Sequence, residues 1–381
     1  MIELEHVTKV YPDGTDAVKG VTLQINEGEV CILLGPSGCG KTTTMKMINR
    51  LIAITDGHIY IDGQVNTQMN ENQLRRSIGY AIQEIGLFPH MTVGQNIATV
   101  PSLLGWSRKQ RRERASELLD LVGMNPDDFI DRYPSELSGG QRQRVGVARC
   151  LGADPPILLM DEPFGAIDPI TREKLQNEFL KIQQEIKKTI VFVTHDFDEA
   201  LKMGDRIALM QQGELIQYDQ PSVLLSHPKN EFVRDFVGAD RALKGIRLMR
   251  VKEVMRQNPP KVNLDDSVER ARQVMDQDRR DWAVVVDEDN RLCGWANRKN
   301  LDEGQTVRDI LMPPTTTATT DTVLNEALSL MLMSAIGNLG IVDRQGRLEG
   351  VLTYNAIRRV LGEIYAEEEA DEEQTTEEVQ S

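Results

Sequence analysis

The first stretch with a clear chemical meaning matches the pattern G-x-x-x-x-G-K-[ST] and consists of Gly35, Pro36, Ser37, Gly38, Cys39, Gly40, Lys41 and Thr42. It directly follows the apolar run 30–34, and a helical pattern continues from Thr43. In a strand, loop and helix of this kind, backbone N–H groups surround phosphate oxygens and the helix N-terminus attracts anions. Lys41 can reach the terminal phosphates, and Thr42 can offer its hydroxyl to Mg²⁺. The stretch therefore predicts a nucleotide-phosphate site.

Carboxylates and a histidine follow two further apolar runs. Asp161 and Glu162 come at the end of the run that starts at residue 157, and His195 closes the run 189–194. An Asp at a strand end beside a phosphate loop can hold Mg²⁺ through water, and a neighbouring Glu can accept a proton from an attacking water. We therefore expect Asp161 near the metal, Glu162 as the general base and His195 at the γ-phosphate.

A second glycine-containing stretch consists of Ser138, Gly139, Gly140 and Gln141, and we expect a helix to begin just after it, near Arg142. A Ser-Gly-Gly sequence at a helix start makes an end that can bind an anion. This stretch is therefore a second candidate for contact with phosphate.

Three single residues complete the candidates. Gln83 ends the apolar run 78–82, and Asp168 ends a turn that begins at Gly165. Tyr11 lies just before a Pro-Asp-Gly turn, where its ring can stack on an adenine; a half-buried strand tyrosine is the alternative.

The elements that must position these residues are strands and helices in alternation. The first 30 residues alternate as short strands do, and five-residue apolar runs are typical of buried strands. Helical patterns rich in Arg and Glu extend from about Val93 to Val122. The basic cluster within them, residues 108–114, indicates a solvated helix face, with a phosphate-binding surface as the alternative.

Composition narrows the class of protein. The chain has 381 residues and a formal net charge of −15, part of which comes from the acidic stretch 367–378, so nucleic acid is not the expected partner. No apolar run approaches the roughly 20 residues of a membrane-spanning helix, and the N-terminus does not resemble a signal peptide, so we expect a cytoplasmic protein. The 4 cysteines are scattered without a C-x-x-C pair, which argues against a zinc site or a disulfide framework.

The C-terminal third contains an internal repeat at an offset of 56 residues. Val286 and Asp287 recur as Val342 and Asp343, and Gly294 recurs as Gly350. Each copy predicts an extended segment, a helix, two strands joined by an Asp-containing turn, and a final helix.

Taken together, the motifs from Gly35 to His195 resemble the ordered motif set of ABC-type ATPase subunits over residues 1 to about 240. The resemblance implies that two copies pair head to tail and clamp two ATP molecules, each between the Gly35 loop of one chain and Ser138 to Gln141 of the other. It also implies Mg²⁺ and the following roles: Tyr11 on adenine; Lys41 and Thr43 in the phosphate loop; Thr42, Gln83 and Asp161 at Mg²⁺; Glu162 as base; His195 on the γ-phosphate; and Asp168 against the partner chain.

The C-terminal repeat resembles a pair of CBS domains. The combined resemblance implies an α/β fold with a phosphate-loop NTPase core, an N-terminal β subdomain and a helical subdomain, then a tandem βαββα module. The expected boundaries are an ATPase domain 1–240, a linker 241–253, CBS domains 254–311 and 312–365, and an acidic disordered tail 366–381, which is either a solubilising tail or part of a salt sensor.

CBS pairs commonly bind adenosyl ligands, and an adenine nucleotide or cyclic dinucleotide is what the resemblance implies here. The sequence departs from that family at the ribose-binding Thr and Asp. Asn297 and Asn300 stand at these positions in the first copy, and Thr353 and Ala356 stand there in the second. This departure puts ordinary AMP or ATP binding at the pair in question.

An ABC ATPase with a C-terminal CBS pair is similar to the ATP-binding subunits of quaternary-amine osmoprotectant importers for glycine betaine, carnitine or choline. The resemblance implies separate membrane permease subunits, an indirect link to a substrate-binding protein, and a peripheral position on the cytoplasmic face of the membrane. We expect the loop from Gln83 to Val93 to dock the permease. The alternatives are an ATPase of an importer for another small solute and a soluble regulatory or DNA-associated ABC ATPase.

Overall fold

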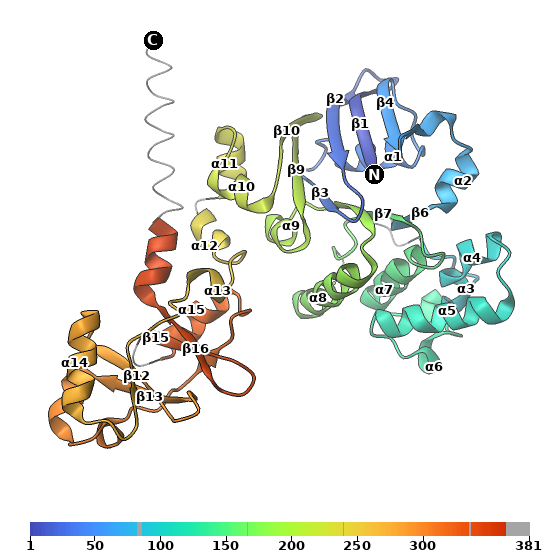
Figure 1. Ribbon diagram of the computed structural model, residues 1–381. Helices are drawn as coiled ribbons and strands as arrows, with labels where there is room; N and C mark the ends of the chain where they lie inside the picture. The colour runs from blue at the N-terminus through green and yellow to red at the C-terminus, as the bar shows by residue number, and fades with distance from the viewer. Residues whose placement is uncertain (82–85, 166, 239, 335–336, 363–381) are drawn as a thin grey trace, which may run out of the picture. The chain divides into compact units, whose positions relative to one another are not determined.

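The computed structural model describes residues 1–81, 86–165, 167–238, 240–334 and 337–362. The described residues form two compact units, one from Met1 to Val237 and one that begins at Gly238 (Figure 1). Gln83 and the expected acidic tail lie outside the described residues.

The first unit opens with an antiparallel sheet in the order β2-β1-β4-β5. Buried and exposed side chains alternate along the second half of β2, as they do in a strand with one face on a core. Ile2 and Leu4 of this sheet share one hydrophobic core with Leu33 and Val191 of the next sheet. The strands are β1 Ile2–Val10, β2 Asp16–Ile25, β4 Asp56–Ile61 and β5 Gln64–Val65.

The second sheet has the order β10-β9-β3-β8-β7-β6, and its strands run parallel except for the antiparallel edge strand β10. Every residue of β3, β7 and β8 is buried, which explains their continuous apolar sequences. Because parallel strands end at the same edge, Gly35, Asp161 and His195 follow one edge of the sheet. The strands are β3 Val30–Leu34, β6 Ile78–Ala81, β7 Ile157–Asp161, β8 Thr189–Val193, β9 Arg206–Gln211 and β10 Glu214–Asp219.

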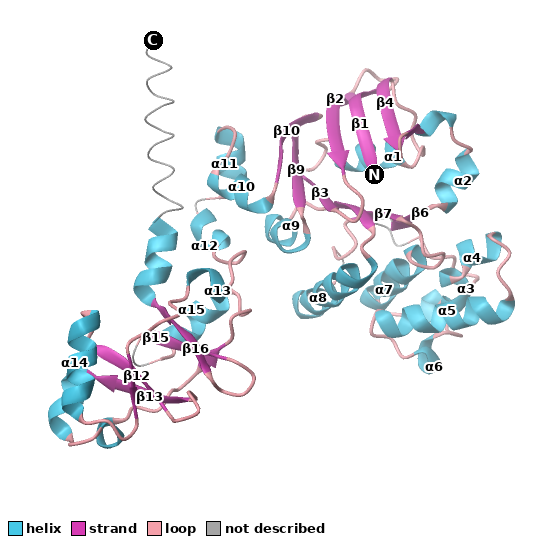
Figure 2. Ribbon diagram, in the orientation of Figure 1, coloured by secondary structure: helices cyan, strands magenta, loops and turns pink. Residues whose placement is uncertain are grey.

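The helices α3, α5 and α7 pack on one another and gather away from the first sheet (Figure 2). The expected helical stretch 93–122 divides into α3, α4 and α5. The helices of this unit are α1 Lys41–Ile48, η1 Asn66–Gln68, α2 Glu71–Arg76, α3 Val93–Ile97, α4 Thr99–Leu103, α5 Arg108–Leu121, α6 Pro126–Phe129, η2 Pro134–Glu136, α7 Gly139–Cys150, α8 Pro169–Ile186, α9 Phe197–Met203, α10 Pro221–Ser226 and α11 Glu231–Val237.

The start of α7 differs from the expectation of a helix that begins near Arg142. Ser138 Oγ accepts a hydrogen bond from Gln141 N at 3.3 Å, and Gln141 Oε1 accepts one from Ser138 N at 2.8 Å. This reciprocal capping box starts the helix at Gly139. The glycine pair is therefore the first turn of the helix rather than a loop before it.

The second unit contains the two sequence repeats, each built around a three-stranded sheet. The last helix of the repeat is formed by residues 354–362 in the second copy, whereas the first copy has only the short η3, which Gly304 follows. The elements are α12 Arg241–Gly245, α13 Val251–Val254, β11 Lys261–Asn263, α14 Val268–Asp278, β12 Trp282–Val286, β13 Leu292–Asn297, η3 Arg298–Glu303, η4 Val307–Ile310, β14 Thr317–Ala318, α15 Leu324–Leu332, β15 Asn338–Val342 and β16 Leu348–Thr353.

The expected linker 241–253 lies within the second unit, which begins at Gly238. Val251 and Val254 of α13 are buried in the core of the second repeat, beside Leu324 and Leu339. At the same offset of 56 residues, Val307 and Ile310 of η4 are buried in the core of the first repeat. Each repeat is therefore completed by the short helix that precedes the other repeat in the sequence, and the end of the segment 241–253 contributes to a folded core.

Candidate nucleotide-binding site

The loop between β3 and α1 requires glycine at both of its ends. Gly35 has φ +144° and Gly40 has φ +106°, which are left-handed values that side chains rarely adopt. A Cβ atom would lie 2.2 Å from Met210 O at Gly35 and 2.4 Å from Ala17 O at Gly40. The backbone can take this tight curve only because both residues lack a side chain.

Lys41 lies inside the curve of this loop. Its Nζ donates hydrogen bonds to Gly35 O at 2.7 Å and Pro36 O at 2.9 Å, and it lies 3.6 Å from Cys39 Sγ. The residue is only 6% exposed. The loop carbonyls thus hold a buried ammonium group at the start of a helix, where both the positive charge and the helix N-terminus attract an anion.

Thr42 and Asp161 come together from two separate strand-to-helix connections. Thr42 Oγ1 donates a hydrogen bond to Asp161 Oδ1 at 3.1 Å. Burial raises the pKa of Asp161, and the Thr42 hydroxyl opposes that rise. A hydroxyl and a carboxylate beside a phosphate loop are the hard oxygen ligands that Mg²⁺ takes together with phosphates and water. These residues fit the expected metal position; the third expected ligand, Gln83, lies outside the described residues.

The structure also brings Glu162 and His195 into contact, although the sequence analysis assigned them separate roles. His195 Nδ1 lies 3.0 Å from Glu162 Oε1. The His195 side chain is 63% exposed and that of Glu162 is 21% exposed, so both can meet a ligand. The Glu162 backbone has φ +45°, which is the left-handed region, and its N–H donates to Val193 O at 3.0 Å.

A residue that the sequence analysis missed is Glu199. Thr194, which directly precedes His195, donates from Oγ1 to Glu199 Oε2 at 2.5 Å, and Gln176 of α8 donates to Glu199 Oε1 at 2.9 Å. Burial raises the pKa of Glu199. The available signal was the pattern Asp196-x-x-Glu199 at the start of α9, which is typical of a capping box.

Tyr11 lies next to the start of α1. Its hydroxyl oxygen is 3.4 Å from Thr43 Oγ1, and Lys9 Nζ lies 5.2 Å from the centre of its ring. The ring is thus placed beside the first turn of α1, with the ammonium group of Lys9 over its face. Its role as an adenine platform stays a prediction.

The Ser138 stretch and Asp168 line a common surface depression together with Gly140, Gln141 and Thr171. Asp168 caps α8 by accepting a hydrogen bond from Thr171 N at 3.0 Å, and that bond lowers the pKa of Asp168. A Cβ atom added at Gly139 or Gly140 would meet nothing within 4 Å. The surrounding chain therefore leaves room at both glycines, and the bare backbone remains open to a molecule from outside.

The basic cluster on α5 is largely paired. Arg112 makes two hydrogen bonds to Asp131, at 2.9 and 2.8 Å, and Arg111 donates to Ser102 Oγ at 2.6 Å. Arg108, Arg111 and Arg112 line one side of a groove whose other side is formed by residues of α3 and α4. The contacts favour a solvated helix face that borders a groove.

Asn297 and Thr353, which stand at the first ribose-binding position of their copies, cap local helices. Asn297 Oδ1 accepts a hydrogen bond from Lys299 N at 3.0 Å, and Thr353 Oγ1 accepts one from Ala356 N at 3.2 Å. Both side chains are therefore engaged at the end of the second long strand of their repeat.

Comparison with known proteins decides the family. The ABC transporter family matches residues 18–165, and the CBS domain family matches residues 251–303 and 307–363. The glycine betaine/carnitine/choline transport ATP-binding protein OpuCA of Bacillus subtilis is 46% identical over 97% of this chain and 98% of its own length. The chain belongs to the ABC transporter ATP-binding proteins.

Two further similarities refine this placement. The osmoprotectant import ATP-binding protein OsmV of Salmonella typhimurium is 46% identical to this ABC protein over 94% of the chain and 95% of its own length. The dimeric structure of a post-hydrolysis state of the ATP-binding cassette MJ0796, bound to ADP and Pi, is similar with a TM-score of 0.54 and 37% identity, over 58% of this chain and 99% of that one. Among the described residues of this ABC protein, no helix is long and apolar enough to cross a membrane.

Proposed function

We propose that this ABC protein binds Mg-ATP at the Gly35 loop and hydrolyses it to energise the uptake of quaternary-amine osmoprotectants. The observation that carries the proposal is the convergence of Lys41, the Thr42–Asp161 pair and the Glu162–His195 pair at one edge of the parallel sheet. Lys41 binds the terminal phosphates, Thr42 and Asp161 hold Mg²⁺ with Gln83, and Tyr11 receives the adenine.

Hydrolysis needs a base beside the γ-phosphate. Glu162 accepts the proton of the attacking water, and His195, which contacts Glu162 at 3.0 Å, binds the γ-phosphate. Mg²⁺, when bound, neutralises charge on the phosphates. The partial positive charge at the N-terminus of α1 also stabilises the negative charge of the phosphates.

The second half of each site comes from another copy of the chain. Gly139 and Gly140 leave an open backbone surface at the start of α7, which suits the close approach of a phosphate held by a partner's Gly35 loop. Asp168 lines the same depression as Ser138 and would contact the partner chain. The similar cassette MJ0796 is dimeric with ADP and Pi bound, which supports a site completed by a second copy.

Membrane permease subunits are the proposed second partner. They would hold the protein at the cytoplasmic face of the membrane and link it indirectly to a substrate-binding protein. The groove along α3, α4 and α5 includes Met91 and Thr92, which belong to the loop expected to dock the permease, and it carries the exposed Leu103. The names of OpuCA and OsmV support osmoprotectants as the transported class.

Co-purification from membranes tests the proposal against its alternatives. We expect the chain to be recovered with spanning subunits, and Leu103→Asp to weaken that recovery while Leu51→Asp, which changes an exposed leucine outside the groove, leaves it intact. A chain that stays in the soluble fraction would favour a regulatory ATPase. Uptake assays in vesicles with glycine betaine, carnitine and choline separate this function from transport of another solute.

Regulation through the CBS pair is the remaining part of the proposal, with an adenine nucleotide or a cyclic dinucleotide as ligand class. Because Asn297 and Thr353 cap helices, we expect AMP and ATP to bind the pair weakly. Calorimetric titration with each nucleotide, on a chain in which Lys41→Ala has weakened the Gly35 loop, measures binding at the pair separately.

A further inference from the structure

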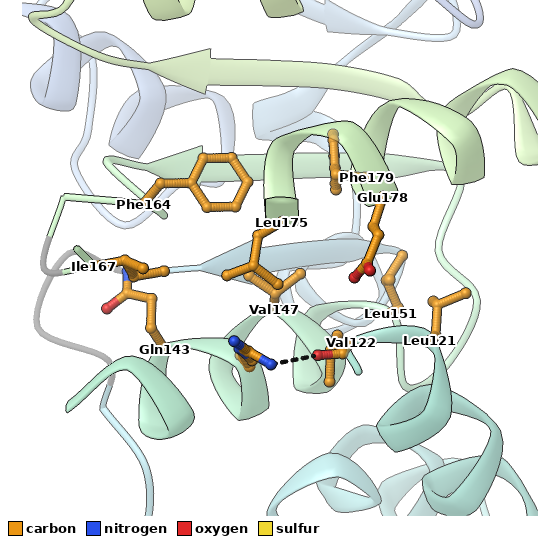
Figure 3. A pocket seen from close by; sticks show the side chains of 11 residues that line it. Leu121, Val122, Gln143, Val147, Leu151, Phe164, Ile167, Leu175, Glu178 and Phe179 are labelled. Carbon is orange, nitrogen blue, oxygen red and sulfur yellow. Dashed lines mark hydrogen bonds between the residues drawn. The ribbon is translucent and has the colours of Figure 1, made fainter. Parts of the chain in front are cut away.

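Gln143 lies in the second turn of α7, shortly after the Ser138 stretch, and is only 4% exposed. It lines a small cavity between α7 and α8 (Figure 3). Apart from Arg144 and Glu178, the other lining residues are apolar, and the figure shows Gln143 beside Ile167 on the connection between β7 and α8. An amide is therefore buried at a position where the surroundings suit a hydrocarbon.

The hydrogen bonding of this amide is incomplete. Gln143 Nε2 donates to Glu162 O at 3.5 Å, whereas Gln143 Oε1 has no hydrogen-bond partner in the described part of the chain. Buried polar side chains nearly always have partners, so an unpaired amide oxygen calls for an explanation outside packing. Among the described residues, the hydrogen-bond partner of the Gln143 side chain is the backbone carbonyl of Glu162, the proposed general base.

The backbone of Glu162 is held from three directions. Its φ of +45° is unfavourable for a residue with a side chain, and such conformations persist only when neighbouring groups impose them. Glu162 N donates to Val193 O at 3.0 Å, Gly165 N donates to Glu162 O at 3.1 Å, and Gln143 adds the contact from α7. Gln143 thus links this backbone to α7, the helix that begins at Gly139.

We infer that Gln143 is a positioning residue that couples the start of α7 to the backbone of Glu162. The inference rests on the proposed function, in which the start of α7 meets the nucleotide of the partner chain. A contact of 3.5 Å is at the limit of a hydrogen bond, so a shift of α7 by a few tenths of an ångström strengthens or breaks it. Nucleotide bound by the partner thereby sets the position of the base that serves the chain's own nucleotide.

Replacing the amide by a hydrocarbon of similar length separates coupling from packing. In the assembled transporter, Gln143→Met is expected to lower kcat for ATP by about 10- to 100-fold, because a small displacement of a catalytic group has effects of that order. Nucleotide affinity should stay within about twofold, and the dependence of rate on ATP should become less cooperative. The Tm should not fall, because the variant removes an unpaired buried oxygen.

Val147→Ala is the matched control, because Val147 lies one turn further along α7 and lines the same cavity, but its side chain cannot donate a hydrogen bond to Glu162. It should lower the Tm while kcat stays within about twofold. Gln143→Leu serves as a second replacement in case the methionine variant does not fold.

Normal kcat and cooperativity in a folded Gln143→Met or Gln143→Leu protein would overturn the inference and leave the proposed function intact. A parent protein without ATPase activity would instead refute the proposed function.

Discussion

At the residue scale, Glu162 and His195 form a contact that joins the ends of two neighbouring strands. Asp161 of β7 is paired in register with Val193 of β8, so the residues that follow each strand lie at the same edge of the sheet. The two side chains meet at 3.0 Å. The strand register therefore determines the distance between the proposed base and the proposed γ-phosphate ligand.

Glu162→Gln should leave ATP binding intact and reduce turnover by about 10²- to 10⁴-fold, because the amide keeps the shape of the side chain but cannot act as a base. Equilibrium binding and steady-state hydrolysis measure the two properties separately. Hydrolysis within about tenfold of the parent would contradict the role of Glu162.

Glu199 predicts a pH dependence of stability. Burial raises its pKa in the folded protein above the value in the unfolded chain, so the folded state binds more protons between the two values. Unfolding free energy should therefore fall as pH rises through that window and level off above it. Asp196 adds to the rise in pKa, whereas Thr194, Gln176 and Arg172 oppose it. Thermal unfolding measured across acidic pH should show that stability depends less steeply on pH in Glu199→Gln than in the parent protein. An equal pH dependence in both proteins would show that Glu199 is not its cause.

At the element scale, the capping box at Ser138 fixes where α7 begins. It turns Gly139 and Gly140 into the first helical turn, and neither glycine is needed to avoid a clash within the chain. Gly139 and Gly140 thus form the first helical turn and at the same time leave the surface beside them open.

Gly140→Ala should leave the Tm unchanged or slightly higher, because a helical residue with a Cβ atom loses less conformational entropy on folding. The same change should reduce ATP hydrolysis, because the Cβ atom occupies the space that a partner's phosphate approaches. Melting curves and ATPase assays test both parts. Unchanged hydrolysis would count against phosphate contact at this helix start.

In the second unit, each short helix packs in the core of the other repeat, so a mutation in one of these helices should destabilise the repeat in which it packs. Val251 is fully buried in the core of the second repeat, so Val251→Ala should destabilise that repeat by about 2 kcal/mol. Hydrogen exchange should then accelerate in β15. Val307→Ala is the symmetric control and should accelerate exchange in β12. Faster hydrogen exchange in β12 after Val251→Ala would contradict the assignment of α13 to the core of the second repeat.

At the scale of the whole molecule, the chain divides into an ATPase unit and a repeat unit, and the proposed site is completed only by a second copy. The Ser138 stretch and Asp168 share one depression, whereas Lys41 and Glu162 lie at the sheet edge. A single chain therefore presents two half-sites.

Crosslinking tests this arrangement directly. In a Cys39→Ser background, Ser37→Cys and Ser138→Cys should form a disulfide between two chains when ATP is bound to a Glu162→Gln variant. Removal of Cys39 matters because its thiol lies within the same loop. Equal crosslinking without nucleotide would argue against the ATP-dependent pair.

The sequence alone determined the identity and order of the motifs. The Gly35 loop follows a run of five apolar residues, and Asp161 and His195 come after runs of four, at 157–160 and 190–193. Such runs encode buried parallel strands whose ends share an edge. Local patterns of this kind are readable because each depends on a few neighbouring residues. The start of α7 was misplaced because the capping box at Ser138 outweighed the low helix propensity of two glycines.

Only the tertiary structure decided which distant side chains meet. Thr42 reaches Asp161 across 119 residues, and the half-buried Glu199 accepts hydrogen bonds both from Gln176 of α8 and from Thr194. The segment assigned as a linker folds into the repeat unit because Val251 fills a core formed mostly by residues further along the chain. Such contacts depend on how whole elements pack, and a pattern within one segment does not contain that information.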